Sequence, residues 1–359
     1  MRLLYISTGV TNSGGVSRVL SLKANAFADA LGYEVHIFST NDDSQTTFFS
    51  FSEKVKIHFS KYKNIGLHNI FGFRKEVREL NKALNPDAIF ITDNGLKSFL
   101  IYDCLYPKAI KMYEIHSSTD AFLNQAYYSG IKNKIYQWLI RHQIKKFDKI
   151  IVLKEQFKLG FVPESKQLAI PNPIPFLVDA QSSLHHKKAI AVGLITPRKG
   201  YERMLRSWKK VVQKHPDYQL EIYGEATGNY SIMPLISELG LENQVKVFPP
   251  VRDIEQRYLE ADFLLHSAYS EPFGMVFIEA MALGLPVVCH KTEADDIVIN
   301  GKNGWVAEDE DDYTQKILQL IEHPEFLHSF SENAVETSKR FQLKEIMHRW
   351  QALLSQRKT

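Results

Sequence analysis

The sequence predicts an α/β protein with two Rossmann-like domains, each built on a doubly wound parallel sheet, that face each other across a cleft. Both halves of the 359-residue chain open with an apolar run, a glycine-containing loop, a helical pattern and a second apolar run. Parallel strands joined by helices form such sheets, and ligands bind beyond the carboxyl ends of their strands. The length also suffices for two domains of ordinary size.

The first half is expected to begin with a strand at 2–7, a loop around Gly14 and Gly15, and a helix over 16–31. Short apolar runs bounded by turn residues are typical of buried strands. By this criterion further strands follow at 34–38, 88–92, 111–115 and 149–153.

The second half repeats the pattern with a strand at 188–195, a loop at 196–200, a helix over 201–214 and a strand at 219–223. Further strands are expected at 244–248, 262–267 and 286–290. Prolines at 171, 173 and 175 indicate a stiff hinge. We therefore expect domains at 1–175 and 176–340, followed by a terminal amphipathic helix within 341–359.

The composition is that of a globular protein and does not indicate a membrane-spanning or disulfide-rich one. Hydrophobic residues make up 44% and charged residues 24% of the chain, as in soluble globular proteins. No apolar run reaches the length of a membrane helix, and the opening MRLLYISTG reads as a buried strand. Two cysteines without a pairing or metal pattern favour a reducing cytoplasm. A net charge of +3 gives no argument for nucleic acid as a partner.

The segment EPFGMVFIEAMALGLPVV, at 271–288, is the most informative one. It places Glu271 before a glycine turn and Glu279 on the helix that begins near Gly274 and ends before Gly284. A helix start offers free backbone N–H groups and a positive dipole end, which suits a phosphate. Carboxylates beside it suit hydroxyl groups, so the pattern points to a nucleotide sugar.

Two glutamates separated by seven residues within such a stretch resemble the signature of retaining glycosyltransferases of the glycosyltransferase B fold, family four. The segment VGLITPRKGYERMLRSWKKVVQKHPDYQLEIYGE is similar to the same family. The resemblance implies a metal-independent hexosyltransferase without a cofactor, acting in bacterial cell-surface polysaccharide or lipopolysaccharide synthesis. Its donor would be a UDP-sugar or a GDP-sugar, and its acceptor a glycan or a lipid-linked sugar.

The resemblance also implies roles for single residues. The residues assigned to catalysis are Glu271, which would hold hydroxyls of the transferred sugar, Lys199, which would neutralise the leaving diphosphate, and His116, at a strand end near sugar and acceptor. The donor-binding residues would be Gly15, Arg198, Lys199, Gly224, Val251, Gly274, Met275, Val276 and Glu279, with Glu279 on the ribose. The family's terminal helix crosses back onto the first domain.

One position departs from the family. An arginine usually follows the glycine of the strand near 193, and here that position is Leu194. Arg198 is a candidate replacement for the lost charge. If it does not replace it, we expect either a weak enzyme or a non-catalytic subunit that binds sugar or nucleotide or activates a partner enzyme. A nucleotide-sugar epimerase is a third alternative, and the segment at 271–288 resembles the transferases more closely.

The sequence also contains two acidic clusters and one basic stretch. The acidic residues at 42–43 and 308–312 are interpreted as solvated, and those before the helix near Tyr313 as a helix start rather than a metal site. The basic stretch at 132–146 is expected to bury Tyr136, Leu139 and Ile140. Its basic face could also lie on an anionic membrane surface at the inner face of the membrane, joined by Arg74, Lys75 and Arg78.

Overall fold

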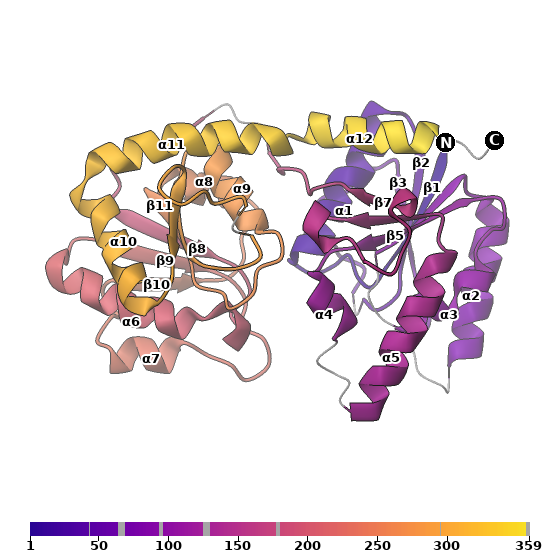
Figure 1. The fold of residues 1–359 in the computed structure, drawn as a ribbon, viewed down its shortest axis with the longest axis horizontal. Helices are drawn as coiled ribbons and strands as arrows, with labels where there is room; N and C mark the ends of the chain where they lie inside the picture. The colour runs from indigo at the N-terminus through magenta and orange to yellow at the C-terminus, as the bar shows by residue number, and fades with distance from the viewer. Residues whose placement is uncertain are drawn as a thin grey trace. The chain divides into compact units, whose positions relative to one another are not determined.

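The computed structural model describes residues 1–42, 44–63, 69–92, 96–124, 130–176, 180–294 and 296–356. The chain divides into two compact units, Met1–Pro173 with Leu343–Thr359, and Ile174–Gln342. The limits expected from the sequence lie two residues away from these. Each unit contains one parallel sheet with helices packed on it (Figure 1), so the predicted fold class is confirmed.

The first unit has a seven-stranded sheet of order β3-β2-β1-β4-β5-β6-β7, in which every neighbouring pair is parallel. Its strands are β1 Arg2–Ser7, β2 Glu34–Ser39, β3 Val55–Phe59, β4 Ala88–Ile91, β5 Ile110–Ile115, β6 Lys149–Val152 and β7 Gln167–Ala169. Its helices are α1 Gly15–Asn25, continued by a π-helical segment Ala26–Ala30, α2 Ile70–Leu84, α3 Leu96–Leu100, α4 Thr119–Leu123, α5 Gly130–Gln143 and α12 Leu343–Ser355.

The second unit has a six-stranded parallel sheet of order β10-β9-β8-β11-β12-β13. Its strands are β8 Lys188–Val192, β9 Gln219–Tyr223, β10 Val245–Phe248, β11 Phe263–His266, β12 Val287–His290 and β13 Gly304–Ala307. Its helices are α6 Tyr201–Lys214, α7 Met233–Glu238, α8 Ile254–Leu259, α9 Met275–Ala282, α10 Glu310–Glu322 and α11 Pro324–Ser338. The chain order reverses between β8 and β11, which is where open α/β sheets bind ligands.

The three strands that the sequence did not predict, β3, β7 and β13, all lie at sheet edges. Edge strands are short and tolerate polar residues because one side of the strand has no neighbour. β3 carries Lys56 and His58, and β7 has three residues, so neither forms an apolar run. The central strands and α6, by contrast, follow the expected bounds closely.

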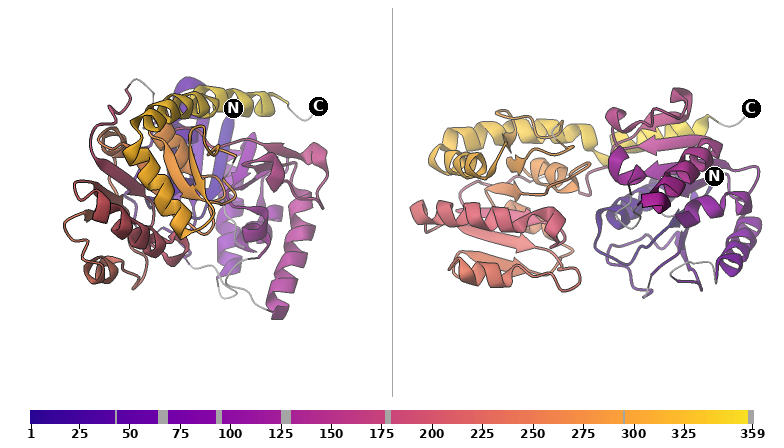
Figure 2. Two further views of the ribbon diagram at one scale, coloured as in Figure 1. Left: turned by 60° about the vertical axis from the view of Figure 1, so that its left-hand side comes forward. Right: turned by 60° about the horizontal axis from the view of Figure 1, so that its bottom comes forward.

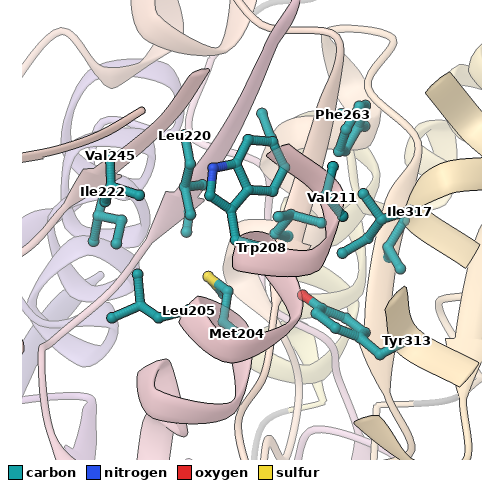
Figure 3. Packing of buried hydrophobic residues seen from close by; sticks show 14 of the residues in the cluster. Met204, Leu205, Trp208, Val211, Leu220, Ile222, Val245, Phe263, Tyr313 and Ile317 are labelled. Atoms are coloured by element: carbon teal, nitrogen blue, oxygen red, sulfur yellow. The ribbon is translucent and has the colours of Figure 1, made fainter. Parts of the chain in front are cut away.

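Trp208 forms the centre of the apolar core of the second unit (Figure 3). It is fully buried on α6 and belongs to the same cluster as Leu220 of β9 and Phe263 of β11. Tyr313 of α10 lies in that cluster as well. Burying a large aromatic side chain removes much apolar surface from water, at about 25 cal/mol per Å². This packing fixes the loops that precede α6 and follow β11.

The terminal helix α12 packs on the sheet of the first unit, as the family resemblance implied (Figures 1 and 2). Trp350 is 2% exposed and meets Phe90 of β4 edge-to-face, with ring centroids 5.6 Å apart. The ammonium of Lys23 lies 3.8 Å from the centre of the Trp350 ring. In the described part of the chain, no helix has both the length and the apolar composition of a membrane span.

Replacing Trp350 with alanine is expected to loosen the first unit selectively. The change opens a cavity above β4, and such losses cost about 3–5 kcal/mol. Hydrogen–deuterium exchange should therefore accelerate in β1 and β4 and stay unchanged in β8 and β9. Gln351→Ala, at an exposed position of the same helix, serves as control. Unchanged exchange in β4 of Trp350→Ala would contradict this account of α12.

Candidate active site

The segment that joins β11 to β12 contains the two glutamates. Gly274 precedes α9 with φ +78°, and a Cβ there would lie 2.4 Å from the Phe277 ring, so the turn requires glycine. α9 is buried along most of its length, and Glu279 is its one acidic residue. The predicted turn and helix are therefore confirmed, and they place Glu271 before the helix and Glu279 within it.

The Glu271 carboxylate is held by three groups. Lys199 Nζ donates to Oε2 at 2.5 Å, and His266 Nε2 lies 3.3 Å from the same oxygen. The amide of Gly274 donates to Oε1 at 3.0 Å. The Glu271 side chain is 14% exposed, so its orientation is set by protein groups rather than by solvent.

These neighbours determine the charge of the carboxylate. Burial would raise the pKa of Glu271, but the Lys199 ammonium and His266 outweigh it and hold that pKa far below its ordinary value. Burial lowers the pKa of His266, so its imidazole is neutral near pH 7. The site therefore contains an ionised glutamate next to a lysine ammonium.

A second carboxylate fixes the backbone of the turn. Glu293 accepts hydrogen bonds from Ser270 Oγ at 2.9 Å and from the amide of Glu271 at 3.0 Å. Arg198 Nη1 donates to the carbonyl of Ser270 at 2.8 Å. Arg198 thus lies beside the turn of Glu271, and Lys199 pairs with the Glu271 side chain.

Glu279 lies deeper than Glu271. It is 4% exposed, and the Tyr258 hydroxyl of α8 donates to its Oε2 at 3.2 Å. The amide of Gly274 is engaged by Glu271, so among the three amides expected to face a phosphate, Met275 and Val276 are the ones left for that role. Both residues belong to the first turn of α9.

The loops after β8, β9 and β10 approach each other closely. A Cβ on Gly224 would lie 2.0 Å from the carbonyl oxygen of Gly193, which explains glycine there by packing alone. Leu194 is 38% exposed. Val251 is half-buried just beyond β10. These loops lie at the carboxyl edge of the sheet, as predicted for a nucleotide pocket.

In the first unit, Gly15 begins α1, and Asp42 organises the loop before it. Asp42 accepts hydrogen bonds from the amide of Val10 at 2.9 Å and from the hydroxyls of Thr11 and Ser39 at 2.6 and 2.5 Å. The interpretation of Asp42 as solvated was therefore wrong, because its carboxylate satisfies loop donors. Asp43 lies outside the described residues.

His116 follows β5 and has a mostly buried side chain, 7% exposed. Its Nε2 lies 3.2 Å from Glu114 Oε2, and both Glu114 oxygens accept hydrogen bonds from Lys23 at 2.7 Å. Burial would raise the pKa of Glu114, but Lys23 and His116 hold it below its ordinary value. A small pocket touches Lys23, Glu114, His116 and Trp350.

The structure adds His266, Glu293, Tyr258, Lys23 and Glu114 to the predicted residues. His266 ends an apolar strand, a position that could have drawn attention in the sequence. Among the acids taken as solvated, Asp309 proves to be the N-cap of α10 and accepts from the amide of Asp312 at 2.8 Å, which confirms the helix-start interpretation.

Residues 179–337 match the family model described as "Glycosyl transferases group 1". This match spans nearly the whole of the second unit, Ile174–Gln342. An uncharacterized glycosyltransferase of Haemophilus influenzae is 25% identical to the chain, covering 98% of it and 99% of the relative. The amylovoran biosynthesis glycosyltransferase AmsD of Erwinia amylovora is 22% identical and covers 99% of each chain.

Solved structures agree on the architecture. Sucrose-phosphate synthase from Thermosynechococcus elongatus superposes with a TM-score of 0.82 at 18% identity, over 99% of this chain and 98% of the other. Anabaena HepE, in complex with UDP and glucose, gives 0.77 at 19% identity over 99% of each chain. The fold is therefore that of the B-type glycosyltransferases, as the sequence resemblance implied.

Removing the ammonium next to Glu271 should change how the stability of the second unit depends on pH. The pKa of Glu271 in the folded state lies below its ordinary value of 4.5, so its stabilising contribution is present above that value and lost as pH falls. Lys199→Met should raise that pKa, because burial of the carboxylate remains.

The measurement is the free energy of unfolding between about pH 3 and pH 6, around the ordinary range of a glutamate. As the pH falls, the free energy of unfolding should decrease less in Lys199→Met than in the wild type. Lys210→Met, which removes the exposed partner of Asp311, should leave the profile unchanged. An unaltered slope in Lys199→Met would show that the pair does not control Glu271.

Proposed function

We propose that the protein is a retaining, metal-independent glycosyltransferase that moves a hexosyl group from a nucleotide diphosphate sugar to a hydroxyl of a glycan or glycolipid. The observation that carries the proposal is the fixed, ionised Glu271 beside Lys199, at the start of a helix that bears the buried Glu279. This arrangement brings acceptors for hydroxyls and donors for phosphate together within one domain.

Glu271 is proposed to accept hydrogen bonds from hydroxyls of the transferred sugar, and Glu279 from the ribose. The amides of Met275 and Val276, with Lys199 and Arg198, would stabilise the diphosphate. Charge grows on its oxygens as the bond to the sugar breaks, so donors fixed in advance favour that step. Gly224 and Val251 are proposed to line the nucleotide pocket. That Gly15 contacts the donor phosphates and that His116 lies near the transferred sugar and the acceptor stay predictions.

The proposed reaction needs no nucleophilic side chain. The bond from the anomeric carbon to the phosphate oxygen breaks, and the acceptor oxygen bonds to that carbon on the same face. The proton of the acceptor hydroxyl passes to the departing phosphate oxygen, which leaves as nucleoside diphosphate. Positioning and charge stabilisation then supply the rate enhancement.

Two similar proteins support the choice of substrate class. Anabaena HepE was solved with UDP and with glucose, which favours a UDP-sugar over a GDP-sugar. AmsD is named for amylovoran biosynthesis, and its similarity extends over the whole chain. We therefore propose a role in the synthesis of a bacterial cell-surface polysaccharide or lipopolysaccharide.

Glu271→Gln should abolish most transfer and keep the fold. The amide oxygen can still accept from Gly274, but the charge opposite Lys199 is lost, and kcat should fall roughly 100- to 1000-fold. The donor is first identified by thermal stabilisation with a panel of nucleotide sugars, and transfer is then followed by release of nucleoside diphosphate.

Glu238→Gln, at an exposed position of α7, is the matched control. Transfer by Glu271→Gln at the wild-type rate would refute the role of this turn. A wild-type protein that binds nucleoside diphosphate but neither transfers nor hydrolyses any donor would instead support the non-catalytic alternative, which rests on Leu194.

Arg198→Ala tests whether this arginine replaces the missing one at position 194. Its guanidinium lies at the turn of Glu271, so removal should weaken binding of UDP about tenfold and leave uridine binding unchanged. Isothermal titration with both ligands measures this, and Arg206→Ala on the exposed face of α6 is the control. Equal losses for UDP and uridine would reject the replacement.

A further inference from the structure

Helix α5 has two apolar faces, and one of them is exposed. Tyr136 and Ile140 are 1% and 0% exposed and pack into the first unit, as the sequence predicted. Leu139, which was expected to be buried with them, is only half-buried. Ile131, Ile135 and Trp138 are 75%, 54% and 64% exposed. These side chains are large and apolar, and most of their surface faces solvent. Packing within their own unit therefore does not account for apolar residues at these positions.

The three exposed side chains form one continuous stripe. At about 100° per residue, positions 131, 135 and 138 fall within an arc of about 60° on one side of the helix. The Trp138 ring also stacks on His142, one turn further along, with centroids 5.8 Å apart. Tryptophan side chains are enriched where apolar and aqueous regions meet in membranes.

The charge around the stripe has one sign. From 121 to 147 the sequence contains no aspartate or glutamate but five cationic residues, at 132, 134, 141, 145 and 146. Lys134, Arg141, Lys145 and Lys146 are exposed. By the same helical spacing Lys134 and Arg141 follow one border of the stripe. An apolar stripe bordered by cations complements a surface that is apolar inside and anionic outside.

The cations of helix α2 have contacts within their own unit. Arg74 pairs with Asp103 at 2.5 Å, Lys75 lies 3.8 Å from Glu79, and Arg78 donates to Cys104 Sγ at 3.5 Å. That Arg74, Lys75 and Arg78 add to the basic face stays a prediction, and the surface is argued from α5 and the turn after it. The cations of α5 and of the turn after it lie in the stretch 121–147, which contains no acidic residue.

The stripe lies near the carboxyl edge of the sheet of the first unit. α5 follows β5 and α4, so it starts at the carboxyl edge of the parallel sheet and runs back toward the amino edge. Residues 131–138 form its first two turns, and His116 follows β5 at that same edge. A surface bound by the stripe would thus lie near the edge where the sheet presents its ligand-binding loops.

We propose that α5 binds the surface of an anionic lipid bilayer, with Ile131, Ile135 and Trp138 in the interfacial region and Lys134, Arg141 and Lys145 at the lipid phosphates. The proposal does not depend on the proposed transfer reaction. Three side chains and a few cations give reversible attachment, with each cation contributing about a fivefold increase in affinity.

The test is sedimentation of the full-length protein with vesicles of phosphatidylcholine alone and of phosphatidylcholine mixed with phosphatidylglycerol. The wild type should bind the mixed vesicles and lose affinity as salt increases. Lys134→Gln/Lys145→Gln should weaken binding roughly 25-fold, at about fivefold per charge. Ile131→Ser/Ile135→Ser/Trp138→Ser should weaken it at least as much, and circular dichroism should show an unchanged fold.

Arg206→Gln/Lys214→Gln, two exposed cations of α6, and Met233→Ser, an exposed apolar residue of α7, are matched controls that should bind like the wild type. Equal binding to both vesicle types, no binding, or wild-type binding by the apolar triple variant would overturn the proposal. The stripe would instead bind a second copy of the chain if the wild type forms a dimer that does not bind vesicles and the triple variant is a monomer.

Discussion

The contact on which the candidate site depends is the ion pair between Lys199 and Glu271. A largely buried carboxylate is costly to ionise unless cationic and N–H groups surround it. Here Lys199 comes from the loop before α6, 72 residues away in the sequence, whereas His266 at the end of β11 and Gly274 at the start of α9 are close neighbours of Glu271 in the chain. The pair therefore exists only when the sheet has brought these elements to one edge.

Backbone packing keeps that edge in place. Gly200, directly after Lys199, has φ +62°, and a Cβ there would lie 2.2 Å from the carbonyl oxygen of Ser267. The loop before α6 and the loop after β11 are thus in direct contact. Trp208 packs between α6 and the sheet, and its burial fixes the helix that follows Lys199. Core packing and site geometry are therefore coupled through the first turn of α6.

The sequence predicted α6, β9 and α9 well because periodicity, glycine stops and apolar runs are local signals. It missed β3, β7 and β13, whose positions depend on neighbouring strands. Lys23 and Glu114 are 91 residues apart in the chain, so no local pattern could reveal their pairing. The same holds for Glu293, which reaches back to the amide of Glu271 across 22 residues.

The ion pair also constrains how a phosphate could bind. The Lys199 ammonium lies 2.5 Å from Glu271 Oε2, so the proposed donor diphosphate would have to draw the lysine away from this oxygen or share it. Glu271 would remain held through Oε1 by the Gly274 amide, and Oε2, which lies 3.3 Å from His266 Nε2, could then also accept from a hydroxyl. The ion pair between Lys199 and Glu271 would then be replaced by two contacts with the ligand. Lys199 would contact a phosphate, and Glu271 would accept from a hydroxyl. A ligand that offers both groups at this spacing gains over one that offers either alone, because a single group would leave Lys199 or Glu271 without its partner.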